Sequence, residues 1–263
     1  MVIRSALFNI LFYLSLILLL ICAIPCFVLP RGAILWFARL WARISSALLR
    51  FVVGTRIEIR GGENIPEGGF IVAGKHQSLW ETFALFLVFR DPVFVFKRQL
   101  GQIPFFGWYM LKLGMIAIDR KRGKSALNQI SDAAGPLIAE GRQLMIFPEG
   151  TRKAVGAPPD YKYGVVHLYN KLDCPVVPVS HISGLYWPRR GFMRNPGTLV
   201  LQILPPIEPG LDPKVFAERL QTVIEDTSNA LLVEAVARDH PPLTDLARAR
   251  LDSLNGTASA AAQ

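Results

Sequence analysis

An uncharged, apolar run near the start of the chain constrains its fold more than any other feature. Between Ser5 and Pro30 there is no charged residue, and most positions are Leu, Ile, Phe, Val or Ala. About 20 apolar helical residues span the hydrocarbon core of a bilayer, and this run is longer. A cleaved signal peptide is disfavoured, because no small-x-small site follows the run. The run therefore predicts membrane attachment, and Pro25 within it leaves a kinked, half-inserted helix open beside a full crossing.

Residues 32–53 predict a second helix of different character. Arg39, Arg43 and Arg50 are spaced by four and seven positions and therefore share one helical face, while aromatic and aliphatic residues fill most of the remainder. Such a helix suits the headgroup layer of a membrane, and a helix packed on the following domain is the alternative. Residues 1–53 are thus predicted to form a membrane anchor, made of an apolar helix and an interfacial amphipathic helix.

The basic residues predict an orientation and a class of partner. Only Arg4 precedes the apolar run, whereas Arg31 and three further arginines follow it, so the positive-inside rule places the rest of the chain in the cytoplasm. The formal net charge of +9 favours anionic partners such as phosphate groups or an acidic membrane surface. Nucleic acid is not predicted as a partner, because the cations lie at strand ends and beside the apolar helices rather than in a continuous run.

Beyond Gly54 the pattern changes to alternating strands and helices. Short β-branched or aromatic runs bounded by Gly, Pro or charge predict strands, and their alternation with helices predicts one α/β domain over residues 54–240. Residues 241–263 are predicted to form a partly disordered tail, and the three scattered cysteines predict neither a disulfide framework nor a metal site. The predicted strands are 56–60, 70–73, 93–96, 115–118, 144–147, 176–180 and 199–203, and the predicted helices are 79–89, 124–139, 165–172 and 213–237, the last capped by Asp212.

The first motif that could take part in a reaction is His76 with Glu81, in the turn between a predicted strand and a predicted helix. Histidine exchanges protons near neutrality, and a carboxylate on one ring nitrogen would leave the other free as a base. Five residues on a continuous helix turn the chain by about 500°, so the pair can meet only if His76 lies in the loop and Glu81 in the first helical turn. The alternative is a capping box, in which Ser78 and Glu81 only close the start of the helix.

Two further motifs offer cations at the ends of predicted strands. Residues 147–152, Phe-Pro-Glu-Gly-Thr-Arg, combine a glycine that allows close approach of a ligand with the planar fork of Arg152. Lys97 and Arg120 each end a predicted strand, on the edge that carries His76 if the strands are parallel. The alternative is a tight turn with exposed arginines, and an aromatic run at 105–109 lines an acyl groove, touches lipid or belongs to the core.

In this order and spacing, these motifs and a proline-bracketed strand at 175–179 resemble the glycerophospholipid acyltransferases. The similarity is greatest to bacterial 1-acyl-sn-glycerol-3-phosphate acyltransferases and extends from Arg56 to Pro209. The family's first block is His, four residues and Asp, and here Glu81 replaces the aspartate, a variant also known in the family. The resemblance implies an α/β fold with a mixed, mostly parallel sheet and crossover helices, preceded by membrane-embedded helices.

The resemblance also implies an activity and roles for named residues. A lysophospholipid hydroxyl is acylated by a thioester, acyl-CoA or acyl-ACP, to make phosphatidic acid, with His76 as the base and Glu81 as its orienting partner. No cofactor is expected, acyl carrier protein is a partner if it carries the donor, and the enzyme sits in the bacterial inner membrane. Alternatives are another acceptor, such as glycerol 3-phosphate or a lyso-ornithine lipid, or a non-enzymatic lipid-binding protein. The residues assigned to the acceptor phosphate are Arg120, Glu149, Gly150, Thr151, Arg152 and Lys97.

Overall fold

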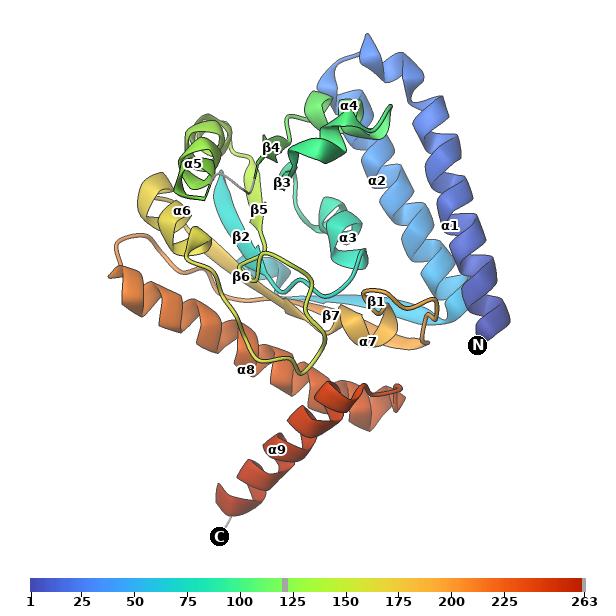
Figure 1. Ribbon diagram of the computed structural model, residues 1–263, viewed down its shortest axis with the longest axis vertical. Coiled ribbons are helices and arrows are strands. Elements are labelled where there is room, and N and C mark those ends of the chain that lie inside the picture. The colour runs from blue at the N-terminus through green and yellow to red at the C-terminus, as the bar shows by residue number, and fades with distance from the viewer. Residues whose placement is uncertain (120–122, 262–263) are drawn as a thin grey trace.

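In the computed structural model, which describes residues 1–119 and 123–261, a seven-stranded sheet forms the centre of the molecule (Figure 1). The strand order is β1-β7-β6-β2-β5-β3-β4, and every pairing is parallel except β6 with β7. The predicted mixed, mostly parallel sheet is confirmed, with all seven strands near their predicted positions. The strands are β1 Thr55–Arg60, β2 Phe70–Gly74, β3 Pro92–Lys97, β4 Ile116–Ile118, β5 Gln143–Ile146, β6 Val176–His181 and β7 Gly197–Ile203.

Helices cover both faces of the sheet (Figure 1). The N-terminal α1 and α2 run antiparallel on one side with α3 and α4, while α5, α6 and α8 lie on the other. Asp212 caps α8 as predicted, its side chain accepting from the backbone N–H groups of Lys214 and Val215. The helices are α1 Val2–Cys22, α2 Arg31–Leu48, α3 Trp80–Val88, α4 Phe106–Lys112, α5 Lys124–Ala139, α6 Gly164–Leu172, α7 Ser183–Tyr186, α8 Pro213–Asp239 and α9 Asp245–Ala261, with short turns η1 Ile24–Phe27, η2 Leu49–Val53, η3 Gly62–Asn64 and η4 Arg98–Gln102.

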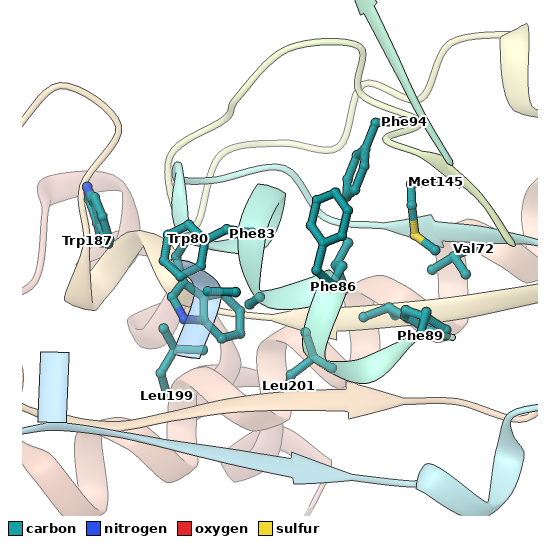
Figure 2. Packing of buried hydrophobic residues seen from close by; sticks show 14 of the residues in the cluster. Val72, Trp80, Phe83, Phe86, Phe89, Phe94, Met145, Trp187, Leu199 and Leu201 are labelled. Carbon is teal, nitrogen blue, oxygen red and sulfur yellow. The ribbon is translucent and has the colours of Figure 1, made fainter. Parts of the chain in front are cut away.

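The alternation of side chains along β2 divides the core into two layers. Phe70 and Val72 face the cluster beneath α1, α2 and α3, whereas Ile71 and Ala73 face the cluster beneath α5, α6 and α8. All four are fully buried, as expected for a central strand covered on both sides. Figure 2 shows α3 laying its aromatic side chains over the first layer. The labelled α3 residues are Trp80, Phe83 and Phe86, and Phe89 follows the helix directly.

The apolar helix α1 lies along the domain rather than standing away from it. Near its start the Ser5 hydroxyl accepts from the backbone N–H of Arg194 at 2.9 Å, and near its end the Tyr109 hydroxyl donates to the carbonyl of Leu20 at 2.9 Å. The helix is long and apolar enough to cross a membrane, and its outer face is exposed. Because both ends of α1 are tied to the domain, this geometry favours the half-inserted helix that Pro25 left open.

The second helix, α2, is packed on the domain, which is the alternative to the interfacial helix predicted from its arginine stripe. It lies between α1 and α3 (Figure 1), with Ile34 and Ala42 buried. The Arg39 guanidinium donates to the carbonyls of Phe86 and Arg90 at the end of α3. These carbonyls have no partner within their own helix, so an arginine from a neighbouring helix satisfies them. One arginine of the predicted polar face, Arg39, therefore forms a contact between α2 and the end of α3.

The C-terminal residues include a helix that the sequence does not predict. The sequence predicts a partly disordered tail over 241–263, whereas the structure has α9 over Asp245–Ala261. Ala247 at its start is fully buried, and Arg250 donates to the side chain of Asn229 on α8 at 2.9 Å. Alanine is the best helix former, so a run rich in alanine needs only such a docked first turn to continue as a helix.

The packing of α1 predicts that its inner face contributes to stability. Phe12 is buried and contacts the rings of Trp41, Phe83 and Trp187. Phe12→Ala should lower the free energy of unfolding by about 3–5 kcal/mol, which corresponds to a Tm lower by roughly 10 °C in detergent. Leu14→Ala, on the exposed face of the same helix, should change it by less than about 0.5 kcal/mol. Equal losses in the two variants would show that α1 is not docked.

Candidate active site

The parallel strands bring the predicted motifs to one edge of the sheet. β5 is paired with both β2 and β3 in parallel, so the carboxyl ends of all three lie together. His76 follows the last residue of β2 by two positions, residues 147–152 follow β5, and Lys97 ends β3. Ligands of open α/β sheets bind beyond the carboxyl ends of the strands. The expected gathering of His76, Lys97 and the 147–152 loop is therefore confirmed by the topology.

His76 and Glu81 form a hydrogen-bonded pair. The Nδ1 atom of His76 lies 2.8 Å from Oε1 of Glu81, with His76 in the loop and Glu81 in the first turn of α3. A carboxylate can only accept, so Nδ1 carries the proton and Nε2 is left as the basic nitrogen. The His76 side chain lines a cavity, whereas Glu81 is fully buried behind it. This arrangement presents a base to the cavity and keeps its partner out of solvent.

Glu81 also closes the start of α3, so the two interpretations of the motif are not exclusive. Its Oε1 atom accepts from the backbone N–H groups of Gln77 and Ser78 at 2.8 Å each, and its Oε2 atom accepts from the hydroxyls of Ser78 at 2.8 Å and Ser183 at 3.1 Å. The Ser78 hydroxyl in turn accepts from the backbone N–H of Trp80 at 2.9 Å. One carboxylate thus caps a helix and orients a histidine.

This set of donors keeps Glu81 ionised although it is buried. Burial alone raises the pKa of a carboxyl group, but the hydrogen bond from His76, the nearby rings of His181 and His76 and the Ser78 backbone N–H outweigh burial and lower the pKa of Glu81 to about 2. His181 itself is fully buried, which lowers its pKa and keeps it neutral; its Nδ1 atom accepts from the Ser183 N–H and its Nε2 atom donates to the Lys75 carbonyl. His181 is therefore a core histidine, which connects the backbone of Lys75 to that of Ser183 beside the site.

The ring and backbone of His76 are held by the loop after β5. The ring stacks on Phe147 with centroids 4.2 Å apart and an interplanar angle of 15°. The backbone N–H of His76 donates to Oε2 of Glu149 at 3.1 Å, and its carbonyl accepts from the Lys153 N–H at 2.8 Å. Stacking, one hydrogen bond on the ring and two on the backbone fix the direction in which Nε2 points.

Glu149 belongs to a buried charge network rather than to the cavity wall. Its Oε1 atom accepts from the ammonium of Lys75 at 2.8 Å, and Lys75 donates equally to Glu225 on α8. Tyr161 donates to the same Glu225 at 3.0 Å, and burial together with this carboxylate raises the pKa of its phenol so that it stays protonated. Both carboxylate oxygens of Glu149 are thus occupied by protein groups. These contacts indicate that Glu149 orders the loop, and its contact with the acceptor phosphate stays a prediction.

The cavity in front of His76 has a volume of about 590 Å³ and is amphipathic, with apolar walls and a polar end. Such a volume is typical of a site for a small ligand. The aromatic run at 105–109 divides: Phe106 and Tyr109 line the cavity, whereas Trp108 is exposed. The apolar walls come from Leu16, Leu19, Leu20 and Ala23 of α1, Ile34, Phe37, Ala38 and Trp41 of α2, Phe86 of α3, Phe94 and Phe96 of β3, and Leu100, Phe106, Tyr109, Met110 and Leu113.

The polar end holds most of the residues predicted to bind phosphate. Gly150, Thr151, Arg152 and Lys97 all line the cavity beside His76. Gly150 has a φ of 65°, a left-handed conformation that glycine adopts without strain, and it turns the loop back after β5. The Arg152 Nε atom is buried without a hydrogen-bond partner among the described residues, so it is available to an anion. Arg120 lies outside the described residues.

Sequence reasoning missed two residues of the site, Ser183 and Arg189. Both lie more than 100 positions from His76 in the chain and reach the site from the segment that follows β6. The only signal in the sequence is their place after a strand that is parallel to β2, at the same edge of the sheet. Among the described residues, no group of three His, Cys, Asp or Glu side chains lies close enough to hold a metal ion.

Comparisons with known proteins establish the family. The sequence model of the family described as Acyltransferase matches residues 56–182. A 1-acyl-sn-glycerol-3-phosphate acyltransferase of Pseudomonas aeruginosa is 41% identical over 179 residues, which are 68% of this chain and 70% of the relative. The chain belongs to the glycerophospholipid acyltransferase family. The resemblance in its motifs is thereby confirmed.

Two further matches agree with this result, one in sequence and one in fold. A 1-acyl-sn-glycerol-3-phosphate acyltransferase of Saccharomyces cerevisiae is 30% identical over 195 residues, 71% of this chain and 64% of the relative. The crystal structure of the 1-acyl-sn-glycerophosphate acyltransferase of Thermotoga maritima matches with a TM-score of 0.74 at 23% identity, over 87% of this chain and 96% of that one. At this identity the structural match speaks for the fold alone.

The lowered pKa of Glu81 predicts how the stability of the acyltransferase depends on pH. The folded pKa of about 2 lies below the ordinary value of 4.5, so ionised Glu81 stabilises the fold above pH 4.5, and this stability is lost as the pH falls toward 2. Denaturant unfolding followed by tryptophan fluorescence should therefore show a steeper loss between pH 5 and 3 for the wild type than for Glu81→Gln. Glu67→Gln, at an exposed position before β2, should match the wild type. Equal slopes for all three proteins would contradict the assigned pKa.

Proposed function

We propose that this acyltransferase moves an acyl group from a thioester to the sn-2 hydroxyl of 1-acyl-sn-glycerol 3-phosphate, making phosphatidic acid for phospholipid synthesis. The observation that carries the proposal is the His76–Glu81 pair at the polar end of an apolar cavity, 2.8 Å apart and beside Arg152. The basic Nε2 atom of His76 and the guanidinium of Arg152 line the same cavity, and the rest of the cavity wall is mainly apolar. An acceptor with a hydroxyl, a phosphate and a fatty chain fits these three features together. The activity named for the relatives agrees with this fit.

His76 acts as the general base of a direct transfer. As the acceptor oxygen attacks the thioester carbonyl, Nε2 takes the hydroxyl proton, and the charge that forms on the ring is stabilised by Glu81 through Nδ1–H. The new C–O bond forms and the C–S bond breaks. The departing thiolate then takes the proton from the imidazolium of His76. Ser78 is not the nucleophile, because its hydroxyl donates to Glu81 and accepts from the Trp80 N–H. No covalent acyl-enzyme is needed, and no cofactor enters the reaction.

The membrane supplies the acceptor. The outer face of α1 exposes a series of large apolar side chains, and the inner side of the same helix lines the cavity. A helix half-inserted in one leaflet therefore places the cavity at the depth of the lipids that fill it. The basic residues that follow the apolar run favour the cytoplasmic side for the domain, where acyl-CoA and acyl carrier protein are found. We propose the bacterial inner membrane as the location and either thioester as the donor.

Substitution of His76 tests the chemical step. His76→Ala should lower kcat by at least about 100-fold, the usual contribution of a general base, while binding to lipid vesicles stays unchanged. Because this variant also removes one hydrogen-bond donor from the buried Glu81, its free energy of unfolding should fall by about 1–3 kcal/mol. A variant that transfers acyl groups at the wild-type rate would exclude His76 as the base.

Glu81→Gln tests the partner more finely. Glutamine can keep its oxygen toward His76 and the backbone N–H groups, while its NH₂ group donates to the hydroxyls of Ser78 and Ser183, which accept as readily as they donate. The helix cap is then preserved, and only the charge is removed. We expect kcat to fall by about 100-fold or more without a comparable change in KM. Full activity would make Glu81 a helix cap alone, and Glu67→Gln is the matched control.

A panel of acceptors and donors tests the substrates. Purified protein in detergent is assayed with acyl-CoA and with acyl-ACP, each against 1-acyl-sn-glycerol 3-phosphate, glycerol 3-phosphate and a lyso-ornithine lipid. The proposal expects the highest kcat/KM with 1-acyl-sn-glycerol 3-phosphate. A higher value with either other acceptor would reassign the substrate while leaving the acyl-transfer chemistry in place.

A further inference from the structure

The loop between α7 and β7 brings an arginine to the polar end of the cavity from outside the predicted motifs. Arg189 lines the cavity together with His76, Gly150 and Arg152. Its NH1 group donates to the Arg152 carbonyl at 2.7 Å, and its NH2 group lies 3.5 Å from the Thr151 hydroxyl. A guanidinium has five N–H groups, so most of them remain available to a ligand.

Arg189 is presented by a rigid loop, although its own side chain is exposed. The buried Arg194 donates from NH1 to the carbonyls of Gly191, Phe192 and Met193, and its guanidinium lies 4.5 Å from the centroid of the Trp187 ring. Residue 195 adds two bonds to the end of α7, and α1 holds the loop through its Ser5 and Asn9 side chains. These bonds within the loop and to α1 and α7 fix the position of the segment that carries Arg189.

Two lysines of this region are paired with carboxylates, so Arg189 can contribute to the charge that an anion site needs. A phosphomonoester carries close to two negative charges at neutral pH, so one guanidinium does not neutralise it. Lys75 is committed to Glu149 and Glu225, and Lys153 to Asp160 at 3.1 Å. Arg152 has a buried Nε atom without a protein acceptor among the described residues. Arg189, held against the backbone of Arg152, supplies a second guanidinium at the same place, and the ammonium of Lys97 lines the same cavity.

We propose that Arg189 binds the phosphomonoester of the acceptor together with Arg152, and that it makes the enzyme prefer acceptors that carry this group. The proposal rests on the proposed function for the identity of the acceptor. Two guanidinium groups on adjacent loops form charge-assisted hydrogen bonds to different oxygens of one phosphate, which fixes the glycerol hydroxyl relative to His76. Arg189 is thus a binding and specificity residue and takes no part in proton transfer.

The chain offers a matched control in Arg190, which is adjacent, equally charged and exposed, and does not line the cavity. With a saturating thioester, Arg189→Ala should raise the KM for 1-acyl-sn-glycerol 3-phosphate about tenfold or more, with kcat nearly unchanged. The kcat/KM for 1-acylglycerol, which lacks the phosphate, should not change. Arg189→Lys should recover part of the loss, since it keeps the charge without the fork, and Arg190→Ala should behave as the wild type.

Four results would overturn the proposal. An unchanged KM in Arg189→Ala excludes phosphate binding, and equal effects of Arg189→Ala and Arg190→Ala show a general effect of positive charge. A fall in kcat alone shows that Arg189 only supports the backbone of Arg152. A raised KM for the thioester, with the acceptor KM unchanged, assigns Arg189 to the phosphates of the donor.

Direct binding separates this proposal from the proposed function. Glycerol 3-phosphate is titrated calorimetrically into the full chain in detergent, without a thioester. Binding should be about tenfold or more weaker in Arg189→Ala than in Arg190→Ala and the wild type. If the wild type fails to acylate 1-acyl-sn-glycerol 3-phosphate, the proposed function fails, and this titration still decides whether Arg189 binds a phosphomonoester. Equal binding by all three proteins would refute the proposal.

Discussion

The site depends on one buried negative charge, that of Glu81, which is held by hydrogen bonds and, among the described residues, by no lysine or arginine. A carboxylate removed from water is very costly unless hydrogen bonds replace its hydration. Glu81 obtains them from its own helix start, from the ring of His76 and from Ser183 after β6. To satisfy this charge, the chain must therefore bring a loop, a helix terminus and a distant segment to one point. The same bonds that keep the carboxylate ionised set the direction of the basic nitrogen of His76.

Local patterns predicted most of the fold and the centre of the site. The seven strands could be recognised because each is a short apolar run with clear ends, and His76 and Glu81 because their separation is set by one loop and one helix start. Arg189 could not be found in this way, since its approach to Arg152 depends on how the loop before β7 is folded. The ion pair of Glu149 could not be predicted either, because its partner Lys75 lies 74 positions away and no local pattern shows that pairing. The helix α9 was missed for a different reason, since its stability comes from docking on α8.

The N-terminal hairpin is part of the site as well as the attachment to the membrane. Side chains of α1 and α2 form one wall of the cavity, and His76 and Phe147 stand at its end. Phe12 on the inner face of α1 packs into the same aromatic cluster as Phe83 of α3. The hairpin and the sheet therefore enclose the cavity together, and neither forms it alone.

The buried network around Lys75 connects the outer helix α8 to the loop that carries His76. Removing one partner of a buried ion pair leaves an uncompensated charge and typically costs about 3–5 kcal/mol. The ammonium of Lys75 is shared between the carboxylates of Glu149 and Glu225, so loss of its charge leaves two carboxylates without this partner, whereas loss of one carboxylate leaves a balanced pair. In related sequences these three positions should therefore vary as a set, with a neutral residue at 225 tolerated more readily than a neutral residue at 75. Glu225, on α8, thereby contributes to the position of the loop that carries His76, through Lys75 and Glu149.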